Sequence, residues 1–147
     1  MPSPDSLRAW QAAIQVAVRV RSLIAQFPRR GYADLRDQMI RSAESIGHNI
    51  AEGRISIFEA EFIRYLDTAA RSAGELSSQL TTAMEYGIVP QREAFNLNGT
   101  VICTRRMIES LRDTAAKPDA PPLPPPPRTR AEPAKKPRNA AKRRRGS

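Results

Sequence analysis

The chain has 147 residues and a net charge of +9, from 24 basic and 15 acidic residues, and this length is typical of one small domain. Its single cysteine, Cys103, excludes an internal disulfide, and its single histidine, His48, excludes a Cys/His zinc site. No apolar run approaches the roughly 18–20 residues of a membrane span, and the first residues do not resemble a secretion signal. We therefore expect a soluble, cytoplasmic protein that has no metal, cofactor or membrane partner and is not an enzyme.

The first predicted helix runs from Leu7 to Phe27 and is apolar around most of its circumference. Its polar residues form only a narrow stripe, and a helix with this pattern is typically buried on two sides. The helix is expected to end at Phe27-Pro28, because a residue before proline is pushed out of the helical region.

The second and third predicted helices meet near Gly53. The second runs from about Asp34 to Glu52, with Gly53 at the position after the helix that glycine favours. Ser56 and Glu59 have the spacing of a capping box and are expected to start the third helix, which reaches about Tyr86. Apolar residues of the third helix alternate in steps of four and three, as in a coiled-coil seam: Phe62, Leu66, Ala69, Ala73, Leu76, Leu80 and Ala83.

A fourth helix is predicted after Pro90, a residue that suits the first turn of a helix, and it extends to about Ala115 with the same alternation. No segment alternates as a strand would between hairpin turns. Four helices with short links predict an all-α fold, an antiparallel four-helix bundle formed by residues 1–116.

Residues 117–147 have a different composition and are predicted to be a disordered tail. They hold ten basic and two acidic residues, a net charge of +8, against +1 for residues 1–116. Residues 118–127 are rich in proline and predict a polyproline stalk, whereas the rest has too little apolar surface to fold. The basic residues that we expect to contact nucleic-acid phosphates by charge are Arg128, Arg130, Lys135, Lys136, Arg138, Lys142, Arg143, Arg144 and Arg145. RNA is favoured over DNA; a solubility tail or a nuclear-import signal is the alternative.

Polar residues within the predicted bundle are interpreted as structural. Asn49 and Glu52 are expected to satisfy backbone groups and a neighbouring arginine, and Arg71 is spaced to pair with Asp67 and Glu75 on the helix surface. A second polar stripe could face a lumen, allow close helix approach or be solvated, and the sequence leaves this open: Gln38, Ser42, Ser45 and Asn49. Cys103 is expected to be buried and inert, and no nucleophile elbow or phosphate-binding loop is present.

Several strings resemble a known family. Residues 45–53 read SIGHNIAEG and residues 62–80 read FIRYLDTAARSAGELSSQL, accompanied by AWQ at 9–11 and by Phe27-Pro28. Over about residues 7–115 the chain resembles the bacterial four-helix-bundle proteins encoded in ribosomal-RNA intervening sequences and the accessory variability determinants of diversity-generating retroelements. Gly47 stands where that family usually has proline, which predicts a looser middle of the second helix.

The resemblance implies a homopentameric barrel that binds RNA or an RNA–DNA hybrid together with a reverse transcriptase and assists complementary-DNA synthesis. Residues expected to support the bundle or the oligomer are Trp10, Asn49, Glu52, Gly53, Arg71 and Glu75. Because the predicted bundle is nearly neutral, nucleic-acid binding is assigned to the tail. Two alternatives are a ribosome-associated or ribosomal-RNA-associated bundle and a protein–protein scaffold whose proline-rich segment is the ligand.

Overall fold

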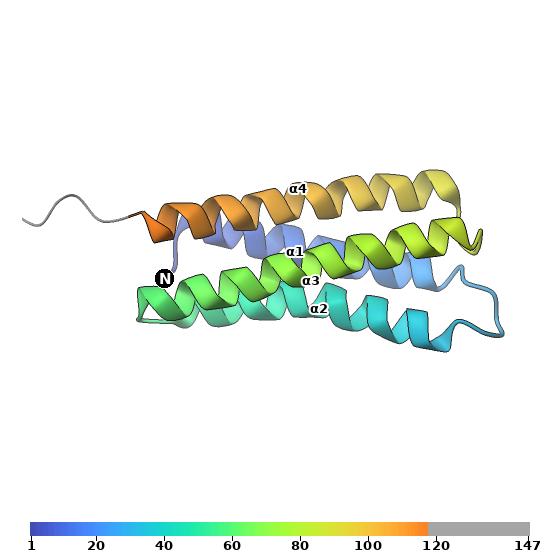
Figure 1. Ribbon diagram of the computed structural model, residues 1–147, viewed down its shortest axis with the longest axis horizontal. Coiled ribbons are helices and arrows are strands. Elements are labelled where there is room, and N and C mark those ends of the chain that lie inside the picture. Colours follow the sequence, from blue (N-terminus) through green and yellow to red (C-terminus); the bar gives the residue numbers. More distant parts are fainter. Residues whose placement is uncertain (118–147) are drawn as a thin grey trace, which may run out of the picture. The chain divides into compact units, whose positions relative to one another are not determined.

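Four α-helices form an antiparallel bundle in the computed structural model, which describes residues 1–117 (Figure 1). They are α1 (Pro4–Ile24), α2 (Ala33–Ile55), α3 (Glu59–Glu85) and α4 (Gln91–Ala116). The predicted all-α, antiparallel four-helix bundle is therefore confirmed. The predictions of a proline-rich stalk and a disordered basic tail fall on residues 118–147, outside the described part of the chain.

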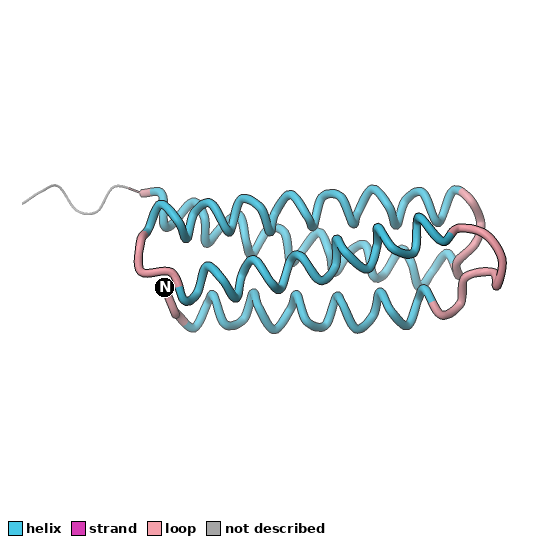
Figure 2. Tube along the Cα trace, turned by 90° about the horizontal axis from the view of Figure 1, so that it is seen from below, coloured by secondary structure: helices cyan, strands magenta, loops and turns pink. Residues whose placement is uncertain are grey.

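Each helix packs against two neighbours. α1 and α3 both contact α2 and α4, so the four helices surround one core. The starts of α1 and α3 share one end of the bundle with the ends of α2 and α4, and short loops close both ends (Figure 2). The α1–α2 loop and the α3–α4 loop consequently lie together at the opposite end.

The core is built from aliphatic side chains of all four helices. The largest fully buried residues are Leu23, Met39, Ile46, Ile50, Leu66, Leu76, Leu80, Leu97, Ile108, Val16, Val20 and Val101. Every residue of the predicted seam on α3 is buried, as expected for a row that recurs every three or four residues on one helix face. None of the helices in residues 1–117 carries an apolar stretch long enough to span a membrane.

The predicted helix end at Gly53 is wrong, because α2 continues to Ile55. Gly53 is buried within the helix, and a Cβ atom there would lie 3.1 Å from Phe62 Cδ2 and 3.3 Å from Tyr65 Cβ. The close approach of α3, and not a left-handed turn, explains this glycine. Gly87, which follows the C-cap Tyr86 of α3, does have the left-handed backbone, with φ of +67°.

The predicted capping box at Ser56 is also wrong. α3 begins at Glu59, after Phe58, with no side-chain cap. The extra turn of α2 places Ser56 at the C-cap of α2, where its hydroxyl donates to the Glu52 carbonyl at 3.4 Å and to the Glu61 carboxylate at 3.2 Å. The side-chain hydroxyl therefore stabilises the end of one helix instead of the start of the next.

Only one face of α1 is buried within the chain, although its pattern predicts burial on two sides. The core-facing row is fully buried and includes Ala13, Val16 and Val20. On the other face, Ile14 and Val18 remain 39% and 55% exposed. α1 thus has an outward apolar surface, Val18 and the part of Ile14 that α2 leaves open, that no other element of residues 1–117 covers.

A pair of glycine substitutions tests the packing of α2 against α3. Gly99 lies in the middle of α4 and is exposed, and a Cβ atom added there would have nothing within 4 Å, so Gly99→Ala should raise the free energy of unfolding by about 0.5–1 kcal/mol through helix propensity. Gly53→Ala has the same gain in propensity, but its new methyl group must displace Phe62 and Tyr65. The free energy of unfolding of Gly53→Ala should therefore be lower than that of Gly99→Ala by about 1 kcal/mol or more. Urea unfolding followed by circular dichroism, at matched protein concentration, measures both. Equal gains would contradict the close approach at Gly53.

Candidate functional site

The basic residues predicted to bind nucleic acid all follow Lys117 and lie outside the described residues. The structure therefore places only the six residues assigned to the bundle or the oligomer. Trp10 lies on α1. α2 carries Asn49, Glu52 and Gly53, and α3 carries Arg71 and Glu75. They do not converge on one site, and they lie instead along different seams of the bundle.

Asn49 joins a hydrogen-bond network between α2 and α3. Its Nδ2 donates to the Ser45 carbonyl at 2.8 Å and to the Ser45 hydroxyl at 3.0 Å. The Ser45 and Ser72 hydroxyls lie 2.8 Å apart across the two helices, and Ser42 and Ser72 are buried. For Ser42 and Ser45 of the polar stripe the structure shows close helix approach, since small hydroxyl side chains occupy the contact, whereas Gln38 is exposed.

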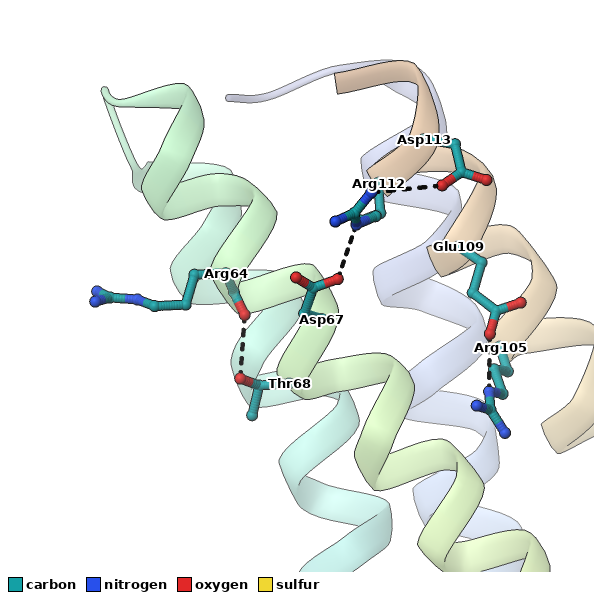
Figure 3. A network of polar contacts seen from close by, with 7 residues as sticks. All are labelled: Arg64, Asp67, Thr68, Arg105, Glu109, Arg112 and Asp113. Carbon is teal, nitrogen blue, oxygen red and sulfur yellow. Dashed lines mark hydrogen bonds and ion pairs between the residues drawn. The ribbon is translucent and has the colours of Figure 1, made fainter. Parts of the chain in front are cut away.

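Glu52 and Arg71 do not form the ion pairs that their spacing suggests. Within residues 1–117, neither side chain has an oppositely charged partner within 4 Å. The carboxylate of Asp67 accepts instead from Arg112 Nε of α4 at 2.9 Å (Figure 3). A contact between helices has replaced the contact predicted along one helix.

The seam between α3 and α4 carries several polar contacts (Figure 3). Besides Asp67–Arg112, Arg105 Nε donates to Glu109 at 2.9 Å, one turn along α4. The guanidinium of Arg105 also lies where a Cβ of Gly74 would be only 2.9 Å from Nη1. These ion pairs are about half exposed, so each stabilises the fold by at most a few tenths of a kcal/mol, while it neutralises an arginine that could otherwise contact phosphate.

The arginines of residues 1–117 that form no ion pair with a described residue are Arg19, Arg29, Arg30, Arg36, Arg41, Arg54, Arg71, Arg92 and Arg106. The exposed ones on the helices are Arg41, Arg71, Arg92 and Arg106. They come from α2, α3 and α4, with Arg92 and Arg106 both on α4. Cys103 lies beside Arg106 and is exposed, so the prediction of a buried thiol is wrong: the position faces outward on α4.

Trp10 lies at an apolar groove between α1 and the end of α2. The groove measures about 630 Å³ and is lined by Pro2, Trp10, Ala51, Arg54, Ile55, Ser56 and Ile57. Ile55 and Ile57 are 75% and 82% exposed. The groove adjoins the uncovered face of α1, so the apolar surface extends from α1 to the α2–α3 corner. Sequence periodicity missed the corner because its isoleucines lie past the end of the helical repeat.

The same corner holds the amino group of Met1. It donates to the carbonyls of Gly53 at 3.0 Å, Arg54 at 2.6 Å and Ser56 at 3.0 Å, which satisfies acceptors left open at the end of α2. Partial burial lowers the pKa of this amino group, and the nearby charge of Arg54 lowers it further.

Gly47 does not loosen α2, contrary to the expectation from its place in the family pattern. α2 is continuous through this residue, and Gly47 is buried with Ile14 Cδ1 of α1 3.4 Å from the place of a Cβ. A Cβ at Gly47 would make ordinary van der Waals contact with α1, whereas one at Gly53 would be crowded by α3.

Two substitutions compare the buried network with the exposed ion pair. Ser45→Ala removes the partner of both Asn49 Nδ2 and the Ser72 hydroxyl, and should lower the free energy of unfolding by about 1 kcal/mol. Asp67→Asn removes only an exposed charge interaction and should change it by less than about 0.5 kcal/mol. Thermal and urea unfolding of both variants measure the two losses in free energy of unfolding. A larger loss in Asp67→Asn than in Ser45→Ala would contradict this prediction.

Comparison with known proteins agrees with this geometry. The sequence profile of the family described as 23S rRNA-intervening sequence protein matches residues 5–110. A crystal structure of a protein of unknown function from the S23 ribosomal protein family of Bacteroides thetaiotaomicron has a similar fold, with a TM-score of 0.69 and 21% sequence identity. The match covers 74% of this chain and 98% of that one, and at this identity it shows the fold alone. No curated protein matches closely. The profile match spans most of the bundle, and the chain therefore belongs to the 23S rRNA-intervening sequence protein family.

Proposed function

We propose that this chain is a non-enzymatic, RNA-associated protein that acts as a homo-oligomer, with ribosomal RNA as the favoured partner. The observation that carries the proposal is membership of a family named for intervening sequences of 23S rRNA. Charge segregation supports it, because residues 117–147 carry a net +8 and residues 1–116 only +1.

In this proposal the tail contacts RNA and the bundle supplies the assembly. The basic and acidic residues of the bundle nearly balance, 14 against 13, whereas the basic residues after Lys117 are close together in sequence and face only two acidic residues. Several tails on one oligomer would bind one RNA with increased avidity. Such binding tracks phosphates and reads no bases, since the tail holds no aromatic residue.

The uncovered face of α1 supports self-association. Val18 and Ile14 of α1 are exposed together with Ile55 and Ile57 at the adjoining groove, and contiguous exposed apolar surface typically marks an interaction site. We place the subunit interface there, and the family resemblance favours a homopentamer.

A finer role follows from the resemblance to accessory variability determinants. In that role the oligomer binds a reverse transcriptase and its RNA template, and assists complementary-DNA synthesis. Co-purification with ribosomal subunits or 23S rRNA would support the ribosomal role, whereas co-purification with a polymerase would support the retroelement role. A scaffold would retain its partner without any nucleic acid.

The tail's contribution to RNA binding can be measured as a salt dependence. Full engagement of eight net charges on single-stranded RNA predicts a slope of log K against log salt of about −6. Replacing Lys142, Arg143, Arg144 and Arg145 with glutamine should reduce the magnitude of that slope by about 3. Fluorescence anisotropy with a 23S rRNA fragment across a salt series gives both values.

A matched control removes four charges from the bundle. Arg41, Arg71, Arg92 and Arg106 changed together to glutamine alter the net charge by the same amount but should leave the slope within about 1 of the wild type. A larger loss in this control than in the tail variant would overturn the assignment of binding to the tail. Equal binding by duplex DNA would remove the preference for RNA.

Self-association through α1 predicts a specific loss. Val18→Glu places a charge on the exposed apolar face and should shift the mass in solution from a multiple of 16.3 kDa, five chains for a pentamer, to the 16.3 kDa monomer. Thr81→Glu, an exposed change on α3, should leave the assembly intact. Light scattering at micromolar concentration measures both, and a wild-type monomer would refute this part of the proposal.

A further inference from the structure

A second groove lies between α2 and α3 at the end of the bundle that holds the α1–α2 and α3–α4 loops. It measures about 550 Å³ and is lined by Tyr32, Asp34, Leu35, Gln38, Glu75, Ser78, Gln79, Thr82 and Tyr86. None of these residues is basic, although the chain as a whole carries +9. The groove is distinct from the face of α1 assigned to self-association.

Two tyrosines stand together at this groove. Tyr32 directly precedes α2 and Tyr86 directly follows α3, and their ring centroids lie 5.9 Å apart with an angle of 40° between the planes. Both side chains are substantially exposed, at 41% and 60%. Tyr32 has φ of +61°, in the left-handed region that favours glycine. Glycine would adopt this backbone conformation more easily than tyrosine does.

The groove carries two carboxylates, which only accept hydrogen bonds, whereas its hydroxyls and amides can donate or accept. The carboxylates of Asp34 and Glu75 form no ion pair with any described residue. A ligand that suits these two carboxylates brings positive charge and N–H donors.

We infer that the groove between α2 and α3 binds an arginine side chain of a basic polypeptide partner. A guanidinium stacks on tyrosine rings through cation–π attraction and presents planar N–H donors that match carboxylate oxygens. Tyr32 and Tyr86 supply the rings, and Glu75 and Asp34 supply the carboxylates. Single-stranded RNA could also stack on the rings, but its phosphates would meet two carboxylates. This inference is independent of the proposed RNA binding by the tail.

The test uses the full-length chain with Arg143, Arg144 and Arg145 changed to glutamine, so that its own arginine run does not compete with the probe. The probe is the capped peptide Ac-Arg-Arg-Arg-NH2, and calorimetry or NMR titration gives its Kd. We expect Glu75→Gln and Tyr86→Leu each to weaken binding by about three- to fivefold. Tyr32→Gly should weaken it similarly while leaving the thermal unfolding temperature unchanged or higher, since glycine fits the left-handed backbone.

The matched control is Glu85→Gln, which removes one exposed charge next to Tyr86 without altering the groove lining, and it should stay within twofold of the parent. Ac-Lys-Lys-Lys-NH2 should bind at least about threefold more weakly than the arginine peptide. No measurable binding, equal binding of the two peptides, or equal losses in Glu85→Gln and Glu75→Gln would overturn the inference. Loss of single-stranded RNA binding in Tyr86→Leu and Tyr32→Gly, with the peptide unaffected, would assign the groove to bases instead.

Discussion

The close approach of α3 to α2 is the constraint on which the rest of this bundle depends. Gly53 lets α3 pack against the last turns of α2, and the Ser45–Ser72 contact lies between the same two helices. At these positions a larger side chain would separate the helices, because the interior is close-packed and has little room to give. Small residues therefore determine the spacing of α2 and α3.

This spacing has consequences for both ends of the molecule. Because α2 continues past Gly53 to Ile55, the corner that follows it is short and leaves Ile55, Ile57 and Phe58 exposed. At the other end, the same pair of helices brings Tyr32 beside Tyr86. The apolar groove thus lies between α1 and the end of α2, whereas the acidic, aromatic groove is a product of the α2–α3 packing, and the two surfaces are suited to different partners.

Charge is distributed unevenly along the chain. Residues 1–116 carry a net charge of only +1 because 14 basic and 13 acidic residues nearly balance, and the exposed ion pairs of the α3–α4 seam contribute little stability. Residues 117–147 carry the other +8. In the proposed function, nearly neutral bundles would pack together without strong electrostatic repulsion while the basic tails contact RNA.

Hydrophobic periodicity by itself determined the number of helices, their order and most of the core, because apolar residues every three or four positions can be buried only on one helix face. Composition alone separated the basic tail from the bundle. Tertiary structure decided what local rules could not: Gly53 lies inside a helix, Ser56 ends α2 instead of starting α3, and Asp67 pairs with Arg112 instead of Arg71. Capping and i,i+4 rules consider one helix at a time, whereas each of these outcomes depends on a neighbouring helix. The same holds for Tyr32 and Tyr86, which are 54 positions apart in the sequence and meet only because α2 and α3 run antiparallel.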